Sequence, residues 1–95
     1  MSIKILLADD DPSLRRVIQY KLKQKGYEVN AVEDGEKALD ELSRNRYDLL
    51  LSDIKMPGLD GLELLERSKQ VQSDLEVILI TAHATVPMEI GRAHV

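Results

Sequence analysis

Short apolar runs alternate with segments of helical periodicity along this 95-residue chain. Runs of this kind are typical of buried strands, and the segments between them repeat apolar residues at the spacing of one helical face. Alternating strands and helices predict βαβ units, in which helices cover both faces of a parallel sheet. The expected strands are 3–8, 27–32, 48–53 and 75–81. The length and the lack of repeats or linkers indicate one small α/β domain.

Start and stop residues mark the expected helices. The first helix is predicted to begin with Asp11 as its N-cap and Pro12 in its first turn, and to stop at Gly26. Its apolar residues recur at helical spacing: Leu14, Val17, Ile18 and Leu22. Its basic residues are expected to form a solvated face: Arg15, Arg16, Lys21, Lys23 and Lys25. Two further helices are expected after Asp34 and after the loop 56–61.

Composition excludes several classes of function and site. The net charge of -4 and a pI near 5.1 argue against nucleic-acid binding through a basic face. The chain has no cysteine, which excludes disulfides and thiolate metal sites. It has no signal-peptide pattern and no apolar run of membrane-spanning length. We therefore expect a soluble, cytoplasmic protein that makes no membrane contact.

Three aspartates follow the ends of two predicted strands. Asp9 and Asp10 come after the first strand, and Asp53 ends the third. Because parallel strands end at the same edge of a sheet, these side chains meet if the two strands are neighbours. Two carboxylates about 4 Å apart repel each other by roughly 4 kcal/mol at an effective dielectric constant near 20. Such a cluster needs raised pKa values or a cation, and an all-oxygen site suits Mg²⁺.

The stretches DDDPSLRRV, SDIKMPGLDG and ILITAH resemble, in this order and at these strand ends, the receiver domain of bacterial two-component response regulators. The resemblance covers residues 3 to about 88 and is greatest to receivers of the nitrogen-regulator (NtrC-like) type. It implies a flavodoxin-like (CheY-like) doubly wound parallel sheet with strand order 2-1-3-4. It also implies two partners, which are a sensor histidine kinase and an AAA+ and DNA-binding output domain. The chain itself would make no direct nucleic-acid contact.

The resemblance also implies a role for each candidate site residue. Asp53 would be the phosphoacceptor, which takes a phosphoryl group from a phosphohistidine of the kinase. Asp10 would bind Mg²⁺ directly, Asp9 would hold it mainly through water, and Lys55 would contribute its backbone carbonyl. Thr81 would donate a hydrogen bond to a phosphoryl oxygen and move inward on phosphorylation. In this role the domain assists its own phosphoryl transfer and is not an enzyme acting on an outside substrate.

The end of the chain departs from the family. A receiver domain has a fifth strand ending in a lysine and a fifth helix beside the first, and ATVPMEIGRAHV offers no counterpart to either. The stretch up to Met88 resembles the start of a fourth helix, whereas residues 90–95 resemble a translated sequencing-library adapter. We therefore interpret 1–88 as a partial receiver domain and 89–95 as a non-native tail. An unpaired fourth-strand edge would make the chain marginally stable, or prone to self-association through that edge.

Three alternative interpretations apply to the same residues. Asp9 and Asp10 could serve only as helix-capping or solubilising residues. A haloacid-dehalogenase-like phosphatase also uses a strand-end aspartate with Mg²⁺, but it needs a second aspartate two residues later, where this chain has Lys55. A receiver fold that no longer takes phosphate, and acts only as an interaction module, is the third. His83 has no second histidine nearby and is not expected to bind metal.

Overall fold

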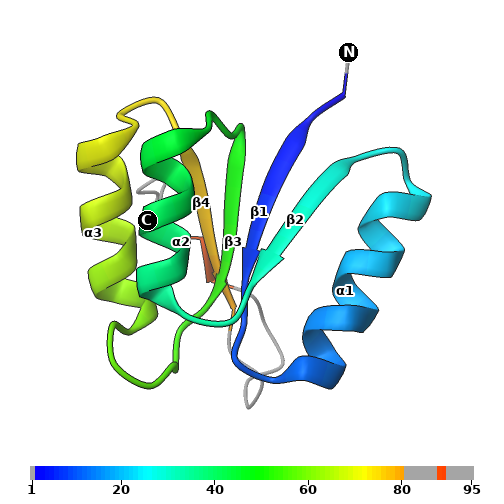
Figure 1. Cartoon of the computed structure of the whole chain (residues 1–95), viewed down its shortest axis with the longest axis horizontal. Coiled ribbons are helices and arrows are strands. Elements are labelled where there is room, and N and C mark those ends of the chain that lie inside the picture. Colours follow the sequence, from blue (N-terminus) through cyan, green and yellow to red (C-terminus); the bar gives the residue numbers. More distant parts are fainter. Residues whose placement is uncertain (1, 81–87, 90–95) are drawn as a thin grey trace.

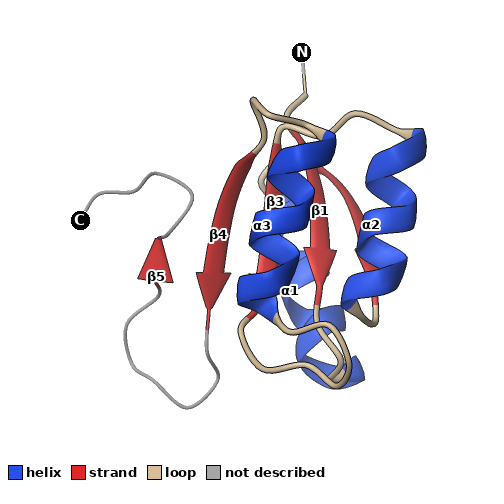
Figure 2. Cartoon of the chain, turned by 90° about the vertical axis from the view of Figure 1, so that its left-hand side faces the viewer, coloured by secondary structure: helices blue, strands red, loops and turns tan. Residues whose placement is uncertain are grey.

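The computed structural model describes residues 2–80 and 88–89, which form a sheet flanked by helices (Figures 1 and 2). Four parallel strands lie in the order β2-β1-β3-β4, as predicted. Their bounds are β1 (Lys4–Ala8), β2 (Glu28–Val32), β3 (Leu49–Asp53) and β4 (Glu76–Ile80). This order places β1 and β3 side by side at the centre, so their carboxyl ends are neighbours.

In the described part of the chain, three helices cover the two faces of this sheet. The helix α1 (Pro12–Gln24) lies on one face, and α2 (Gly35–Arg44) and α3 (Gly61–Val71) lie together on the other (Figure 1). An aspartate caps each of them: Asp11, Asp34 and Asp60 each accept backbone N–H groups of the first turn. The first helix ends as predicted, because Gly26 adopts a φ of +96°, which glycine tolerates and other residues rarely do.

The core is deeper on the face covered by two helices. There Leu6, Leu50 and Leu79 of the sheet are fully buried against Leu64 of α3 and Leu42 of α2. On the opposite face, the buried residues are Ile5, Leu7 and Val29, with Ile18 and Leu22 of α1 partly buried against them. No residue of α1 is fully buried, and Val17 is 49% exposed. The apolar stripe predicted for α1 is therefore only half covered.

The free edge of β4 differs from the sequence-based expectation. We expected no strand after β4, but β5 (Met88–Glu89) pairs with it antiparallel, with Met88 opposite Leu79 and Glu89 opposite Ile78 (Figure 2). A parallel crossover needs a dozen or more residues, whereas an antiparallel return needs few, and only residues 81–87 separate the two strands. The prediction of a wholly unpaired edge is therefore wrong, as is a helical Met88. Residues 90–95 lie outside the described part of the chain.

None of the helices that the structure describes combines the length and the apolar character that crossing a membrane requires.

Candidate functional site

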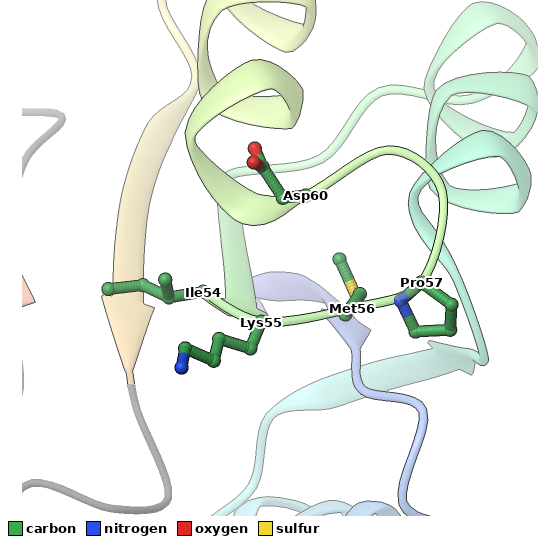
Figure 3. Close-up of a pocket in the computed structure, with 5 residues that line it drawn as sticks. All are labelled: Ile54, Lys55, Met56, Pro57 and Asp60. Atoms are coloured by element: carbon green, nitrogen blue, oxygen red, sulfur yellow. The ribbon is translucent and has the colours of Figure 1, made fainter.

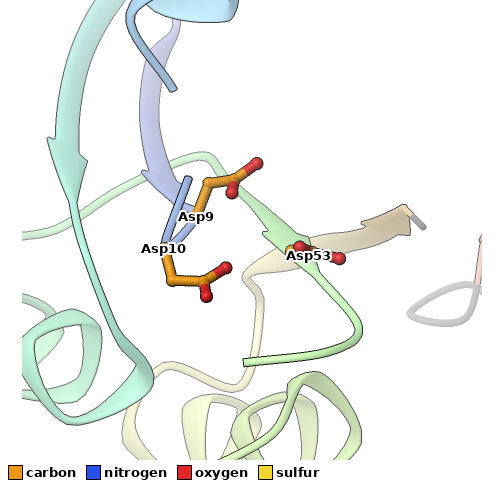
Figure 4. Close-up of side chains that lie close together, drawn as sticks. All are labelled: Asp9, Asp10 and Asp53. Atoms are coloured by element: carbon orange, nitrogen blue, oxygen red, sulfur yellow. The ribbon is translucent and has the colours of Figure 1, made fainter. Parts of the chain in front are cut away.

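The three candidate carboxylates meet at one edge of the sheet. The register pairs Ala8 with Ser52, so Asp9 and Asp53 follow directly from adjacent positions of β1 and β3. One carboxylate oxygen from each of Asp9, Asp10 and Asp53 lies within 4.8 Å of the other two. Figure 4 shows the three side chains at the ends of these two strands. The site is thus assembled by the pairing of two strands that are more than forty residues apart in the sequence.

Asp9 is the most deeply buried of the three, with no exposed surface. Its Oδ1 accepts a hydrogen bond from the backbone N–H of Asp11 at 2.9 Å. Its Oδ2 is buried as well, and among the described residues it has no hydrogen-bond partner. A buried carboxylate oxygen without a donor is costly, so this atom is suited to a ligand such as a cation.

The electrostatic environment of Asp9 also favours a bound cation. Burial raises the pKa of this carboxyl above its ordinary value, and the hydrogen bond from Asp11 opposes that rise. The nearby negative charges of Asp53 and Asp10 raise the pKa further. Each of these influences except the hydrogen bond disfavours the ionised form, and a bound cation reverses the balance. The donor set consists of oxygen atoms alone, which fits a hard ion such as Mg²⁺.

Asp53 is held at the exit of β3 with 8% of its surface exposed. Its Oδ1 accepts a hydrogen bond from the backbone N–H of Lys55 at 3.3 Å. The intervening Ile54 is anchored on both sides. Its N–H donates to the carbonyl of Ile80 at 2.7 Å, and its own carbonyl accepts from the N–H of Gly61 at 2.8 Å. The Asp53 carboxylate therefore sits on a backbone fixed to both β4 and α3, with only a small part of it accessible.

A hollow of about 520 Å³, which the sequence did not indicate, lies along the loop after Asp53. Its lining residues are Ile54, Lys55, Met56, Pro57 and Asp60 (Figure 3). Met56 is buried, whereas Lys55 is exposed. Asp60 accepts the N–H of Glu63 at 2.9 Å, which agrees with its assignment to the loop before α3. The residues that line the hollow directly follow Asp53 in the sequence, and they give the acidic cluster an apolar flank.

The remaining predicted residues are placed only in part. The backbone N–H of Lys55 contacts Asp53, while the role predicted for its carbonyl stays a prediction. Thr81 and His83 lie outside the described residues, and so does any contact that they make with the acidic cluster.

Comparison with known proteins identifies the fold family. Residues 5–93 match the model of the response regulator receiver domain. The chain belongs to this family. As a receiver domain it is a signalling domain of two-component phosphorelays, and its sheet order is the one expected for the CheY-like fold.

Curated relatives of this receiver domain include regulators of different length. This chain is 39% identical over 83 residues to the transcriptional regulatory protein GlrR of Escherichia coli, a match that covers 87% of this chain and 19% of GlrR. It is 39% identical over 85 residues to the response regulator receiver protein CpdR of Brucella abortus, covering 90% of this chain and 71% of CpdR. The chain thus spans about a fifth of the first relative and less than three quarters of the second.

Solved structures of one further relative resemble this receiver domain closely. The response regulator TrrA of Thermotoga maritima, in complex with Mg²⁺ and BeF, matches with a TM-score of 0.82 and 38% identity, over 86% of this chain and 71% of that one. A structure of the histidine kinase ThkA in complex with TrrA matches with a TM-score of 0.82 and 35% identity, over 94% of this chain and 77% of that one.

Proposed function

We propose that this receiver domain accepts a phosphoryl group on Asp53 from a sensor histidine kinase. The observation that carries the proposal is the meeting of Asp53 with Asp9 and Asp10 within 4.8 Å at one sheet edge. Asp53 is nearly buried, and its Oδ1 is engaged by the Lys55 N–H. Within residues 2–80 no hydrogen bond engages its other oxygen, which we propose as the nucleophile.

The proposed reaction is a phosphoryl transfer between two side chains. The oxygen of Asp53 forms a bond to phosphorus while the P–N bond of the phosphohistidine breaks, and the electron pair of that bond goes to the leaving imidazole. The product is an aspartyl phosphate. Transfers of this kind ask the protein mainly for positioning and for compensation of charge. The anchored backbone around Ile54 supplies the positioning, and Thr81 is proposed to donate to a phosphoryl oxygen.

We call the sheet edge that carries Asp9, Asp10 and Asp53 the acidic edge, and it is proposed to hold Mg²⁺. Asp10 is exposed and would be a direct ligand, Asp9 would act mainly through water, and the Lys55 carbonyl and Asp53 would complete the protein donors. When bound, the ion would neutralise the clustered carboxylates and the charge of the incoming phosphoryl oxygens. The unpartnered Oδ2 of Asp9 and the raised pKa of this residue support the proposal.

The partners are proposed from the relatives. The complex of TrrA with the kinase ThkA supports a sensor histidine kinase as the phosphodonor. The match to a transcriptional regulator supports an output domain in the parent protein, which we propose to be an AAA+ and DNA-binding unit of the nitrogen-regulator type. In this proposal 1–88 is part of a receiver domain, 89–95 is a non-native tail, and the protein acts in the cytoplasm.

A small phosphodonor provides the test. The chain is incubated with acetyl phosphate and Mg²⁺, and intact mass is measured before and after hydroxylamine treatment, which cleaves acyl phosphates. We expect one labile phosphoryl group per chain in the wild type and none in Asp53→Asn. Asp60→Asn is the matched control, because asparagine also caps a helix, and it should be labelled like the wild type.

Two outcomes would contradict the proposal. Steady release of phosphate without an accumulated acyl phosphate would indicate the phosphatase alternative. No labelling of the wild type, or equal labelling of Asp53→Asn, would indicate an interaction module that does not take phosphate on Asp53.

A further inference from the structure

Arg15 makes a contact that links α1 to the acidic edge. Its Nη1 donates a hydrogen bond to the backbone carbonyl of Asp9 at 2.9 Å, and its own N–H donates to the carbonyl of Asp11. The side chain therefore runs from the first turn of α1 back to the end of β1. This corrects the sequence-based expectation of a solvated Arg15, which is half-buried, whereas Arg16 is exposed as expected.

The contact acts on a residue that is fixed at three points. The N–H of Asp9 donates to the carbonyl of Val32 at 3.1 Å, and Oδ1 of Asp9 accepts the N–H of Asp11 at 2.9 Å. Both of these partners are backbone groups. The third point, the carbonyl of Asp9, is held by the Arg15 side chain. Among the described residues, Arg15 is thus the side chain that completes the fixation of Asp9.

The carbonyl of Asp9 also determines the direction of Asp10. The carbonyl of Asp9 and the N–H of Asp10 belong to one planar peptide group, so a donor that fixes the first fixes the plane from which Asp10 extends. With that plane fixed, the carboxylates of Asp9 and Asp10 keep the positions in which one oxygen of each lies within 4.8 Å of an Asp53 oxygen.

We propose that Arg15 is a positioning residue for the metal site, which orients Asp9 and Asp10 through the peptide between them. The inference rests on the proposed Mg²⁺ site and adds to it a residue outside the cluster. Groups that orient ligands in this way affect metal affinity by roughly tenfold or more when they are removed.

The positive charge of Arg15 is expected to change Mg²⁺ affinity in the opposite direction from its positioning role. The effects of charge and of positioning can therefore be separated. A guanidinium near the site repels Mg²⁺, so removal of its charge alone would tighten Mg²⁺ binding. Loss of positioning would weaken binding instead. Arg16 offers a matched control, because it carries the same charge at the next position, and within residues 2–80 no hydrogen bond or ion pair engages its side chain.

The experiment compares Mg²⁺ dissociation constants of the 95-residue chain and three variants, measured by amide NMR titration. Arg15→Met should bind Mg²⁺ about tenfold more weakly than the wild type. Arg16→Met should bind equally or slightly more tightly. Arg15→Lys retains one donor group without the planar fork, so its affinity should lie between those of the wild type and Arg15→Met.

Two further measurements exclude a merely structural role. In the absence of metal, the Asp11 N–H that donates to Asp9 should exchange with solvent faster in Arg15→Met than in Arg16→Met. Thermal unfolding is recorded for each variant, and Arg15→Lys provides the comparison if Arg15→Met does not fold.

Each result is decisive for one of the two proposals. A wild-type chain that does not bind Mg²⁺ contradicts the proposed function, and the inference about Arg15 falls with it. A wild-type chain that binds Mg²⁺, with equal or tighter binding in Arg15→Met, contradicts the inference alone. A lowered unfolding temperature with unchanged Mg²⁺ affinity would show that Arg15 supports the fold and not the site.

Discussion

A Cβ atom on Gly61 would lie 2.6 Å from the backbone oxygen of Asp53 and 2.7 Å from the Cα atom of Ile54. The first residue of α3 therefore lies directly against the exit of β3. Only a residue without a side chain permits this approach, because both neighbouring atoms belong to the backbone and cannot rotate away. The start of α3 and the backbone of Asp53 are consequently coupled through this close approach.

Gly61→Ala is expected to disturb both stability and the site. The added methyl group must displace the start of α3 or the end of β3, which should lower the free energy of unfolding by about 2 kcal/mol. Chemical denaturation measures this loss, and the rate of labelling by acetyl phosphate should fall with it. Gly26→Asn is the comparison: a Cβ meets nothing within 4 Å there, so any loss of stability comes from the φ of +96° alone and should leave the labelling rate unchanged. Equal stability of Gly61→Ala and the wild type would contradict the close approach.

The raised pKa of Asp9 gives the metal-free chain a specific pH dependence. The folded state keeps the Asp9 proton to a higher pH than the unfolded state does, so this contribution to stability is complete below the ordinary pKa of an aspartate. It is lost as the pH rises through the raised pKa of the folded state. Asp9→Asn lacks this titration, and its amide oxygen can still accept the Asp11 N–H. Its stability relative to the wild type should therefore increase as the pH rises from acidic to neutral.

Mg²⁺ should stabilise the wild type more than it stabilises Asp9→Asn. The wild type gains stability from the bound ion, whereas Asp9→Asn has lost one of the carboxylates of the site. Denaturation curves with and without Mg²⁺, measured at several pH values, test both statements. Parallel pH profiles for the two metal-free proteins would contradict the assignment of the raised pKa to Asp9.

Gln72, the C-cap of α3, is joined to the end of α2 and to the connection between α2 and β3. Its Oε1 accepts the N–H of Tyr47 at 3.2 Å, and its Nε2 donates to the carbonyls of Leu42 at 2.9 Å and Asn45 at 2.7 Å. Gln72 is 7% exposed, so Gln72→Leu leaves these backbone groups without partners. We expect a loss of about 3 kcal/mol in the free energy of unfolding.

The same variant should leave Mg²⁺ affinity unchanged. Gln72 caps the C-terminal end of α3, whereas it is the first residue of this helix, Gly61, that lies against Asp53. Gln70→Leu, on the exposed side of α3, is the matched control and should change stability little. A loss of similar size in both variants would show that helix composition, and not the hydrogen bonds of Gln72, determines the effect.

Tyr47 should ionise late. Its pKa is raised to about 12: burial is the largest cause, the hydrogen bond from Asn30 lowers it, and the hydrogen bond and charge of Glu41 raise it. Its hydroxyl accepts from Asn30 at 2.7 Å and donates to Glu41 at 2.8 Å. The folded state therefore holds this proton longer than the unfolded state, and the resulting stability is lost as the pH rises from 10 to about 12.

Ultraviolet absorbance of the phenolate form measures this step. The late titration should disappear in Tyr47→Phe and persist in Tyr20→Phe, because Tyr20 is 63% exposed and lies on α1. A late step that survives in Tyr47→Phe would contradict the assignment.

Local signals made much of the fold predictable. Asp11 and Pro12 mark the start of α1, and the fully buried Leu6 and Leu50 come from the apolar runs that indicated strands. The meeting of Asp9 with Asp53 followed from strand ends, because parallel strands share an exit edge. The strand order came from the family resemblance, since periodicity gives strands but not their neighbours.

The features that the sequence did not predict depend on contacts between distant segments. Helical periodicity assigns Arg15 to a face of α1, but a long side chain can fold back over the helix start to reach Asp9. Gln72 is an isolated polar residue at a helix end, which is typical of a surface position. Its burial depends on contacts with the end of α2 and with the connection that follows it. The two-residue β5 is too short to leave a pattern.

The acidic edge exists only in the folded chain, because positions 9, 10 and 53 meet only where β1 runs beside β3. An unfolded molecule has no such cluster, so an ion that binds there shifts the folding equilibrium toward the native state by mass action. A melting temperature that climbs with Mg²⁺ concentration would then serve as a binding isotherm. This measurement would test whether the three carboxylates form the site, and it requires no kinase, phosphodonor or output domain.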